Sequence, residues 1–333
     1  MKKRKVLAGL LLAGICLCSC GVKDKETVVK EKNSDDLIVI GFSEVGAESD
    51  WRVAHTESLK NTFTEEKGYE FMFDDARQKQ ENQIASIRNY ILQEVDYIVV
   101  APIVETGWEE VLMEAKEAEI PLIVVDRMME VDEELYTAWV GSDTKKEGDK
   151  AMKWLEEELK KQERDAEEIS IVHVMGTLGS SAQRGRTEGL EEGVALHTNW
   201  EITARIEGGF TQAQTYDAMI ELLETQPDID VIYCENDNSA FGAIQALEEK
   251  GFSYGVGGDI IIIAFDATNA GLTACLKGDI NLDVECNPLH GPRVEKLIEQ
   301  LEAGETPLKR QCVSESFFTQ ENLSEEFIQN RAY

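Results

Sequence analysis

The stretch Ile260-Ile261-Ile262-Ile263-Ala264-Phe265-Asp266 decides the fold, because six apolar residues in a row end in a carboxylate. A strand with one exposed face alternates apolar and polar residues, whereas a parallel strand covered on both faces is apolar throughout. The stretch is therefore predicted to be a buried parallel strand.

Comparable runs recur along the chain, separated by longer amphipathic stretches. Strands are predicted at residues 37–42, 70–73, 97–101, 122–126, 138–141, 169–175, 201–206, 231–234, 260–265 and 282–285. Helices are predicted at 53–67, 81–93, 108–118, 146–161, 186–195, 212–224, 240–250, 269–277 and 291–303. Repeated units of this kind predict an α/β fold with parallel sheets. The roughly 300 residues after position 36 favour two lobes with a cleft between them over one large sheet.

The N-terminus has the features of a secretory leader. Residues 2–5 are basic, and the apolar run at 6–17 is too short to span a bilayer. The sequence Leu17-Cys18-Ser19-Cys20 resembles a bacterial lipobox, and Cys20 is the predicted lipidation site because a small residue precedes it. Residues 1–19 are thus predicted to be a lipoprotein signal peptide, and an ordinary signal peptide with incidental cysteines is the alternative. Residues 20–36 are predicted to be the lipidated cysteine and a flexible polar tether. The mature protein is then extracytoplasmic and anchored to the cell membrane.

The composition argues against several classes of function. Asp and Glu number 65 against 33 Lys and Arg, so a chain of net charge −32 would be repelled by nucleic acid. No nucleophile elbow, zinc-protease motif or phosphate-binding loop occurs. We therefore expect no enzyme activity, no cofactor and no metal, although a dispersed pair of glycosidase carboxylates has no motif to search for. The remaining cysteines are interpreted as buried thiols, with a Cys275–Cys286 or Cys286–Cys312 disulfide as the alternative; they are Cys234, Cys275, Cys286 and Cys312.

Polar side chains gather where the predicted strands end. Ligands of open α/β sheets bind beyond the carboxyl ends of the strands. Carboxylates, amides and guanidiniums pair well with sugar hydroxyls, and an aromatic ring covers the apolar face of a sugar. Capping of the following helix, solvated loop charges and core packing of Trp51 are the alternatives. The predicted ligand-binding residues are Ser43, Glu44, Trp51, Arg52, Asp126, Arg127, Arg184, Asn236, Asp266 and Glu285.

Several segments carry a family resemblance. They are residues 41–52 (Gly-Phe-Ser-Glu-Val-Gly-Ala-Glu-Ser-Asp-Trp-Arg), 78–84, 101–108, 115–121 and 242–246. On these segments the chain resembles the type I periplasmic binding proteins of the ribose- and galactose-binding group, from residue 37 to the C-terminus. Within that group it is most similar to the galactofuranose-binding protein of ABC sugar importers, which has Gln where Glu44 stands here.

The resemblance implies two Rossmann-like lobes joined by a three-stranded hinge. One lobe is expected at residues 37–142 and 287–314, and the other at 143–286 and 315–333. The resemblance also implies sugar contacts at the positions of Asp126, Arg127, Arg184, Asn236 and Asp266. Arg186 is the alternative to Arg184.

The function implied is that of a monomeric binding protein that delivers a monosaccharide to the permease of an ABC importer. Galactofuranose or a related aldose is the expected ligand. A binding protein that presents its sugar to a membrane receptor kinase is the alternative, because it would share every motif described above.

Overall fold

The structure, a computed structural model, describes residues 37–226 and 228–333. The predicted signal peptide, Cys20 and the tether lie outside these residues. Within them, no helix combines the length and the apolar character needed to cross a membrane.

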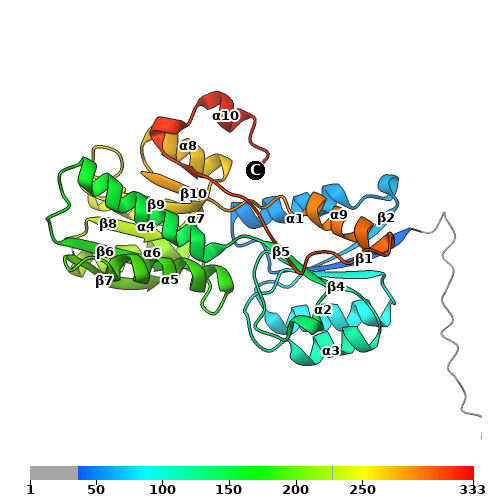
Figure 1. The fold of residues 1–333 in the computed structure, drawn as a ribbon. Helices are drawn as coiled ribbons and strands as arrows, with labels where there is room; N and C mark the ends of the chain where they lie inside the picture. The colour runs from blue at the N-terminus through cyan, green and yellow to red at the C-terminus, as the bar shows by residue number, and fades with distance from the viewer. Residues whose placement is uncertain (1–36, 227) are drawn as a thin grey trace, which may run out of the picture. The chain divides into compact units, whose positions relative to one another are not determined.

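The first lobe is built on a parallel six-stranded sheet with the strand order β11-β5-β4-β3-β1-β2 (Figure 1). Leu59 and Phe63 pack with Val294 and Leu297 on one face, which α1 and α9 cover, whereas α2 and α3 cover the other face. The strands are β1 (Ile38–Glu44), β2 (Tyr69–Asp75), β3 (Tyr97–Val100), β4 (Leu122–Val125), β5 (Ala138–Gly141) and β11 (Arg310–Cys312). The helices are α1 (Asp50–Thr62), η1 (Glu65–Lys67), α2 (Gln80–Leu92), α3 (Glu109–Glu117), η2 (Glu133–Leu135) and α9 (Gly291–Glu302).

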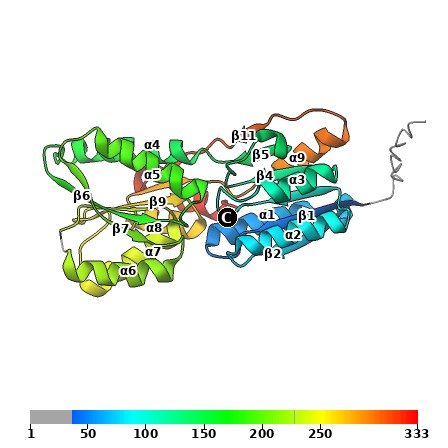
Figure 2. The same ribbon diagram turned by 90° about the horizontal axis from the view of Figure 1, so that it is seen from below.

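The second lobe repeats this plan with the strand order β12-β10-β9-β8-β6-β7, in which only β12 runs antiparallel to its neighbour. Helices α4 and α5 cover one face and α6 and α7 the other (Figure 2). The strands are β6 (Ile169–Met175), β7 (Trp200–Glu207), β8 (Val231–Cys234), β9 (Ile261–Asp266), β10 (Leu282–Glu285) and β12 (Phe317–Phe318). The helices are α4 (Thr144–Lys161), α5 (Ser181–Ala195), α6 (Gln212–Thr225), α7 (Asp237–Lys250), α8 (Asn269–Lys277), η3 (Gln320–Asn322) and α10 (Glu325–Gln329). The predicted two-lobed α/β fold is confirmed.

The chain passes between the two sheets three times, at residues 142–143, 286–290 and 313–316. One carboxylate oxygen joins all three crossings, because Ser142 Oγ (2.5 Å) and the Asn287 backbone N–H (2.8 Å) both donate to Glu315 Oε1. Burial, followed by repulsion from Glu147, raises the pKa of Glu315 to about 8. We propose, as the sequence predicts, that the boundaries between the two lobes lie after residues 142, 286 and 314.

Candidate binding site

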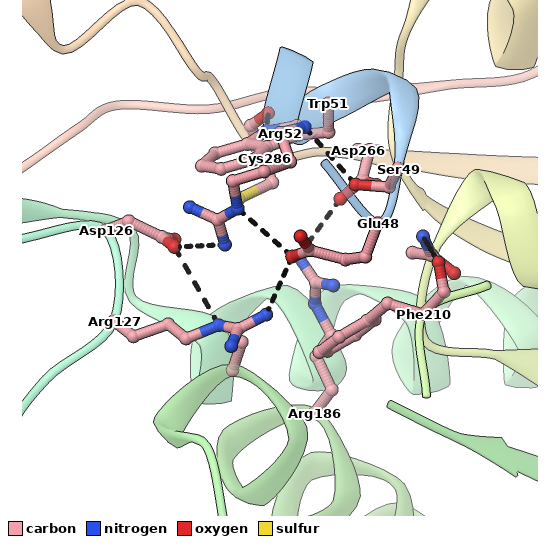
Figure 3. Close-up of a pocket in the computed structure, with 12 residues that line it drawn as sticks. Glu48, Ser49, Trp51, Arg52, Asp126, Arg127, Arg186, Phe210, Asp266 and Cys286 are labelled. Atoms are coloured by element: carbon pink, nitrogen blue, oxygen red, sulfur yellow. Dashed lines mark hydrogen bonds and ion pairs between the residues drawn. The ribbon is translucent and has the colours of Figure 1, made fainter. Parts of the chain in front are cut away.

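A pocket lies where the carboxyl ends of both sheets face each other (Figure 3). Its empty volume is about 310 Å³. Six of the ten predicted ligand-binding residues line it, and these come from both lobes. The lining residues are Glu48, Ser49, Trp51, Arg52, Asp126, Arg127, Ala182, Arg186, Phe210, Asn236, Asp266 and Cys286.

Local backbone structure directs these side chains into the pocket. Ser49 caps helix α1 by accepting from the Arg52 backbone N–H at 3.2 Å, so Trp51 and Arg52 lie on the first turn. Asn236 caps α7 in the same way, accepting from the Ser239 backbone N–H at 2.9 Å. Asp126 directly follows β4 and has a left-handed φ of +61°.

Arg52 is the centre of a buried charge network in the first lobe. Its guanidinium contacts Glu44 and Glu48, each at 3.1 Å, and Asp126 at 2.7 Å. Arg127 reaches Glu48 at 3.3 Å and Asp126 at 3.8 Å. Burial alone would raise the pKa of Asp126, but Arg52 and then Arg127 outweigh burial and lower it to about 2. Asp126 therefore stays ionised, and together with Glu48 it holds two guanidiniums at the pocket wall.

Glu48 has a hydrogen-bond acceptor to spare. Its Oε1 atom takes the contacts with Arg52 and Arg127, whereas its Oε2 atom is buried and has no partner among the residues that the structure describes. A buried carboxylate oxygen without a donor is costly. Because Glu48 lines the pocket, a ligand hydroxyl is a suitable donor for Oε2.

In the second lobe Arg186 has the corresponding place. Its Nε donates to Glu147 at 2.8 Å, Nη1 donates to the backbone carbonyl of Glu235, and Nη2 lies 3.5 Å from Asp266 Oδ1. The guanidinium also stacks on the ring of Phe265, at 4.8 Å from its centroid. Burial raises the pKa of Asp266 well above its ordinary value, and Arg186 offsets this effect only in part.

Two aromatic rings close the pocket. Trp51 is 4% exposed, stacks on His55 at 5.2 Å, and donates its indole N–H to the backbone carbonyl of Cys286 at 2.6 Å. Phe210 belongs to the second lobe, and the guanidinium of Arg127 from the first lobe lies 5.2 Å from its ring centroid. The ring of Trp51 is thus held against the hinge, and the ring of Phe210 packs against the first lobe.

The lobes contact each other on both sides of the pocket. On one side the Asp50 backbone N–H donates to Asn238 Oδ1 at 3.1 Å. On the other side the Met128 backbone N–H donates to Ser181 Oγ at 2.7 Å, and Arg184 pairs with Glu105 at 2.5 Å. The two lobes are therefore in direct contact through residues near the pocket.

Four predicted ligand-binding residues do not line the pocket. Ser43 is fully buried at the end of β1. Glu44 lies behind Arg52 and contacts His55 Nδ1 at 2.6 Å. Arg184 keeps 59% of its side chain exposed. Glu285 is held by Arg331 at 3.2 Å and by the Tyr333 hydroxyl at 2.9 Å.

Sequence reasoning missed five lining residues, which are Glu48, Ser49, Ala182, Phe210 and Cys286. Glu48 and Ser49 lie in the quoted segment after the first strand, so a polar loop beyond a strand end could have indicated them. Ala182, Phe210 and Cys286 are apolar or weakly polar, and nothing in their type or spacing points to a pocket.

All four cysteines of the described residues are free thiols, so neither of the two possible disulfides is formed. Cys234, Cys275 and Cys286 are buried as predicted, whereas Cys312 is exposed at the edge strand β11. Cys286 Sγ lies with carboxylate oxygens of Glu147 and Glu315 within 4.8 Å of one another at the hinge. One oxygen of each carboxylate in this group already accepts a hydrogen bond, Glu147 Oε2 from Arg186 and Glu315 Oε1 from Ser142.

Comparisons with known proteins agree with this architecture. The model of the periplasmic binding protein domain family matches residues 40–285. The galactofuranose-binding protein YtfQ of Escherichia coli K12 is 34% identical over 87% of this chain and 90% of its own length. A Mycobacterium smegmatis protein in complex with β-D-fucofuranose shares 38% identity at a TM-score of 0.81, covering 85% of this chain and 92% of that one. The arabinose-transporter binding protein of Shewanella sp. ANA-3, bound to L-arabinofuranose, shares 35% identity at a TM-score of 0.82, covering 88% and 95%.

The family match and the binding proteins among these relatives confirm the predicted resemblance and the prediction of a binding protein rather than an enzyme. The family is extracytoplasmic. The two lobes, the three crossings and the polar pocket between the sheets thus have one explanation: the chain belongs to the periplasmic binding protein family.

Proposed function

We propose that this protein binds a neutral monosaccharide in its furanose form and delivers it to an ABC importer. The observation that carries the proposal is the pairing of every guanidinium at the pocket with carboxylates of the protein itself. Arg52 and Arg127 contact Glu48 and Asp126, and Arg186 contacts Glu147 and Asp266. No unbalanced positive charge is left for an anionic ligand, whereas charged hydrogen-bonding groups suit sugar hydroxyls.

The apolar surface of the pocket supports a sugar as the ligand. Trp51 and Phe210 supply rings for the C–H face of a sugar. The furanose form is favoured because three relatives that share 34%, 38% and 35% identity are named for galactofuranose, fucofuranose and arabinofuranose.

Delivery to an importer, with the ABC permease as partner, is favoured because one relative is the binding component of an arabinose ABC transporter. A monomer suits this role, because each lobe must stay free to move and to meet the permease.

The ligand can be tested by calorimetry and thermal shift with D-galactose, D-fucose, L-arabinose, D-ribose, D-fructose and D-galacturonate. We expect at least one of the first three sugars to bind and to raise the melting temperature. At a sugar concentration of 100 times its Kd, binding should add about 2.7 kcal/mol to the free energy of unfolding. D-galacturonate should not bind, because its carboxylate finds no unpaired cation. Tight binding of D-galacturonate alone, or of no sugar, would contradict the proposal.

We also propose that Cys20 carries the lipid anchor. Replacing Cys20 with serine should abolish labelling by a palmitate analogue and release the protein from the membrane fraction. Cys18→Ser is the matched control, because it leaves Leu17, Ser19 and Cys20 of the lipobox in place. Labelling that persists in Cys20→Ser, or that disappears in Cys18→Ser alone, would place the anchor elsewhere.

A further inference from the structure

Two carboxylates are buried together behind the second-lobe wall of the pocket. Asp237 opens helix α7 and Asp283 lies on β10, and both are 0% exposed. Their carboxyl groups lie beside each other, because they accept from the backbone N–H groups of the consecutive residues Thr268 and Ala267, and they interact electrostatically. The oxygens Asp237 Oδ1 and Asp283 Oδ2 have no donor among the described protein groups. Two carboxylates can hydrogen-bond only if one of them carries a proton.

The outer oxygens of this pair hold two consecutive residues of one loop. Asp237 Oδ2 accepts from the Thr268 backbone N–H at 2.9 Å and from Thr268 Oγ1 at 2.7 Å. Asp283 Oδ1 accepts from the Ala267 backbone N–H at 3.0 Å. The two outer oxygens, Asp237 Oδ2 and Asp283 Oδ1, thus already accept hydrogen bonds. A proton on the pair therefore belongs between the two inner oxygens, Asp237 Oδ1 and Asp283 Oδ2.

The loop that the pair holds has an unfavourable backbone. Asp266 has a φ of +112° and Ala267 a φ of +56°, although neither is glycine. Such conformations persist only where the surrounding structure fixes them, and they cluster at ligand sites. Asp266 lines the pocket and faces Arg186, so the strained corner determines where its carboxylate points.

The fit behind the corner is tight. A Cβ atom at Gly271 would lie 2.2 Å from Asp237 Oδ2, so the glycine makes room for the pair. Thr268 also caps α8 by accepting from the Gly271 backbone N–H at 3.1 Å. The pair, the corner and the start of α8 therefore form one rigid unit.

We propose that Asp237 and Asp283 share a single proton and act as positioning residues that set Asp266 for the ligand. This inference rests on the proposed function, in that Asp266 is taken to contact the sugar. None of the ion pairs within residues 37–226 and 228–333 involves either member of the pair. The nearest titratable or charged groups are Asp266, Cys275 and Arg331. We therefore infer that a proton, and not a basic side chain, neutralises the charge between the two carboxylates.

The electrostatics support a shared proton. Burial first, and then the neighbouring carboxylates, raise the pKa of Asp237 well above its ordinary value and that of Asp283 to about 7. Above about pH 7 the pair therefore keeps one shared proton, and it takes up a second proton as the pH falls through about 7. An unfolded aspartate titrates near about 3.9. Folding therefore takes up protons between about pH 4 and pH 7, so this pair makes the protein less stable as the pH rises through that window.

Asparagine substitutions give a sharp test. In Asp237→Asn or in Asp283→Asn the amide oxygen can keep the outer hydrogen bonds, and the amide N–H can replace the shared proton. Each single variant should bind D-galactose, D-fucose or L-arabinose, whichever the wild type binds, within about threefold of the wild-type affinity. The double variant turns two N–H groups toward each other and should bind at least roughly tenfold more weakly.

A merely structural role would give additive losses and no change in the pH profile. The melting temperature without sugar should fall between pH 5 and pH 7.5 in the wild type, and more gently in each single variant. If either single variant loses tenfold or more in affinity, or the double variant equals the singles, the shared proton is wrong. If the wild type binds no sugar while its melting temperature falls with pH as expected, and more gently in each single variant, the proposed function fails and the proton pair stands.

Discussion

Replacing Arg186 with alanine is expected to weaken sugar binding by roughly 30-fold or more, whereas Arg184→Ala should change it less than about fivefold. Arg186 is buried at the pocket and contacts Glu147, Glu235 and Asp266. Removing one partner of a buried charged pair costs about 2–5 kcal/mol, and about 1.4 kcal/mol is a factor of ten in affinity. Arg184 bridges the lobes from an exposed position, where an ion pair contributes about 0–1 kcal/mol.

Arg184→Ala is the matched control for Arg186→Ala, because it makes the same chemical change two residues away on helix α5. Calorimetry with the sugar that stabilises the wild type measures both affinities. Arg186→Lys guards against misfolding: it keeps a positive charge beside Glu147 and Asp266 but loses the planar fork, and it should still bind at least roughly tenfold more weakly. Equal losses in Arg184→Ala and Arg186→Ala would show that the pocket is wrongly placed.

This pair of arginines also shows how far the sequence could predict the site. Both stand after the same strand, and residue type alone does not separate them. On an α-helix two residues that are two positions apart point to nearly opposite sides. Only the packing of α5 against the second sheet decides that Arg186 enters the pocket and Arg184 leaves it.

The fold was predictable because most of its strands are short buried apolar runs, whereas the edge strands β2 and β7 alternate apolar with polar or exposed residues. All ten strands predicted from this pattern are present in the structure. The pattern missed β11 and β12, which have three and two residues, lie at sheet edges and have no apolar period. Helix α1 begins at Asp50 and not at the predicted residue 53, because Ser49 caps it there.

The rule of strand ends predicted the pocket residues only in part. It holds for Asp126 and Asp266, which follow or end buried strands and face the other lobe. It does not bring Glu285 to the pocket, because Arg331 and Tyr333 from the C-terminal segment hold that carboxylate. A contact between residues so far apart in the sequence has no local signal.

The Arg52 network is expected to be as important for stability as for binding. Arg52→Met should lower the free energy of unfolding by about 3–5 kcal/mol, because it leaves buried carboxylates without their common cation. The side chain of Arg52 is 3% exposed and contacts Glu44, Glu48 and Asp126. In a protein of this size the melting temperature should fall by about 10 °C. Lys60→Met on the same helix is the control, because its partner Glu57 and Lys60 itself are exposed and the loss should stay below about 1 kcal/mol.

The pH dependence of this loss identifies its cause. Arg52 holds the pKa of Asp126 at about 2, below the unfolded value of about 3.9. Because the folded pKa is lowered, the stability that Asp126 contributes is complete above the unfolded pKa and disappears as the pH falls toward 2. Without Arg52 the pKa of Asp126 rises, because Arg127 is the main cation left to oppose burial, and this contribution is already reduced at neutral pH. Urea unfolding should therefore show a wide gap between wild type and Arg52→Met at pH 7 and a narrower gap at pH 3. An equal gap at both pH values would mean that Arg52 stabilises the lobe by packing and not by charge.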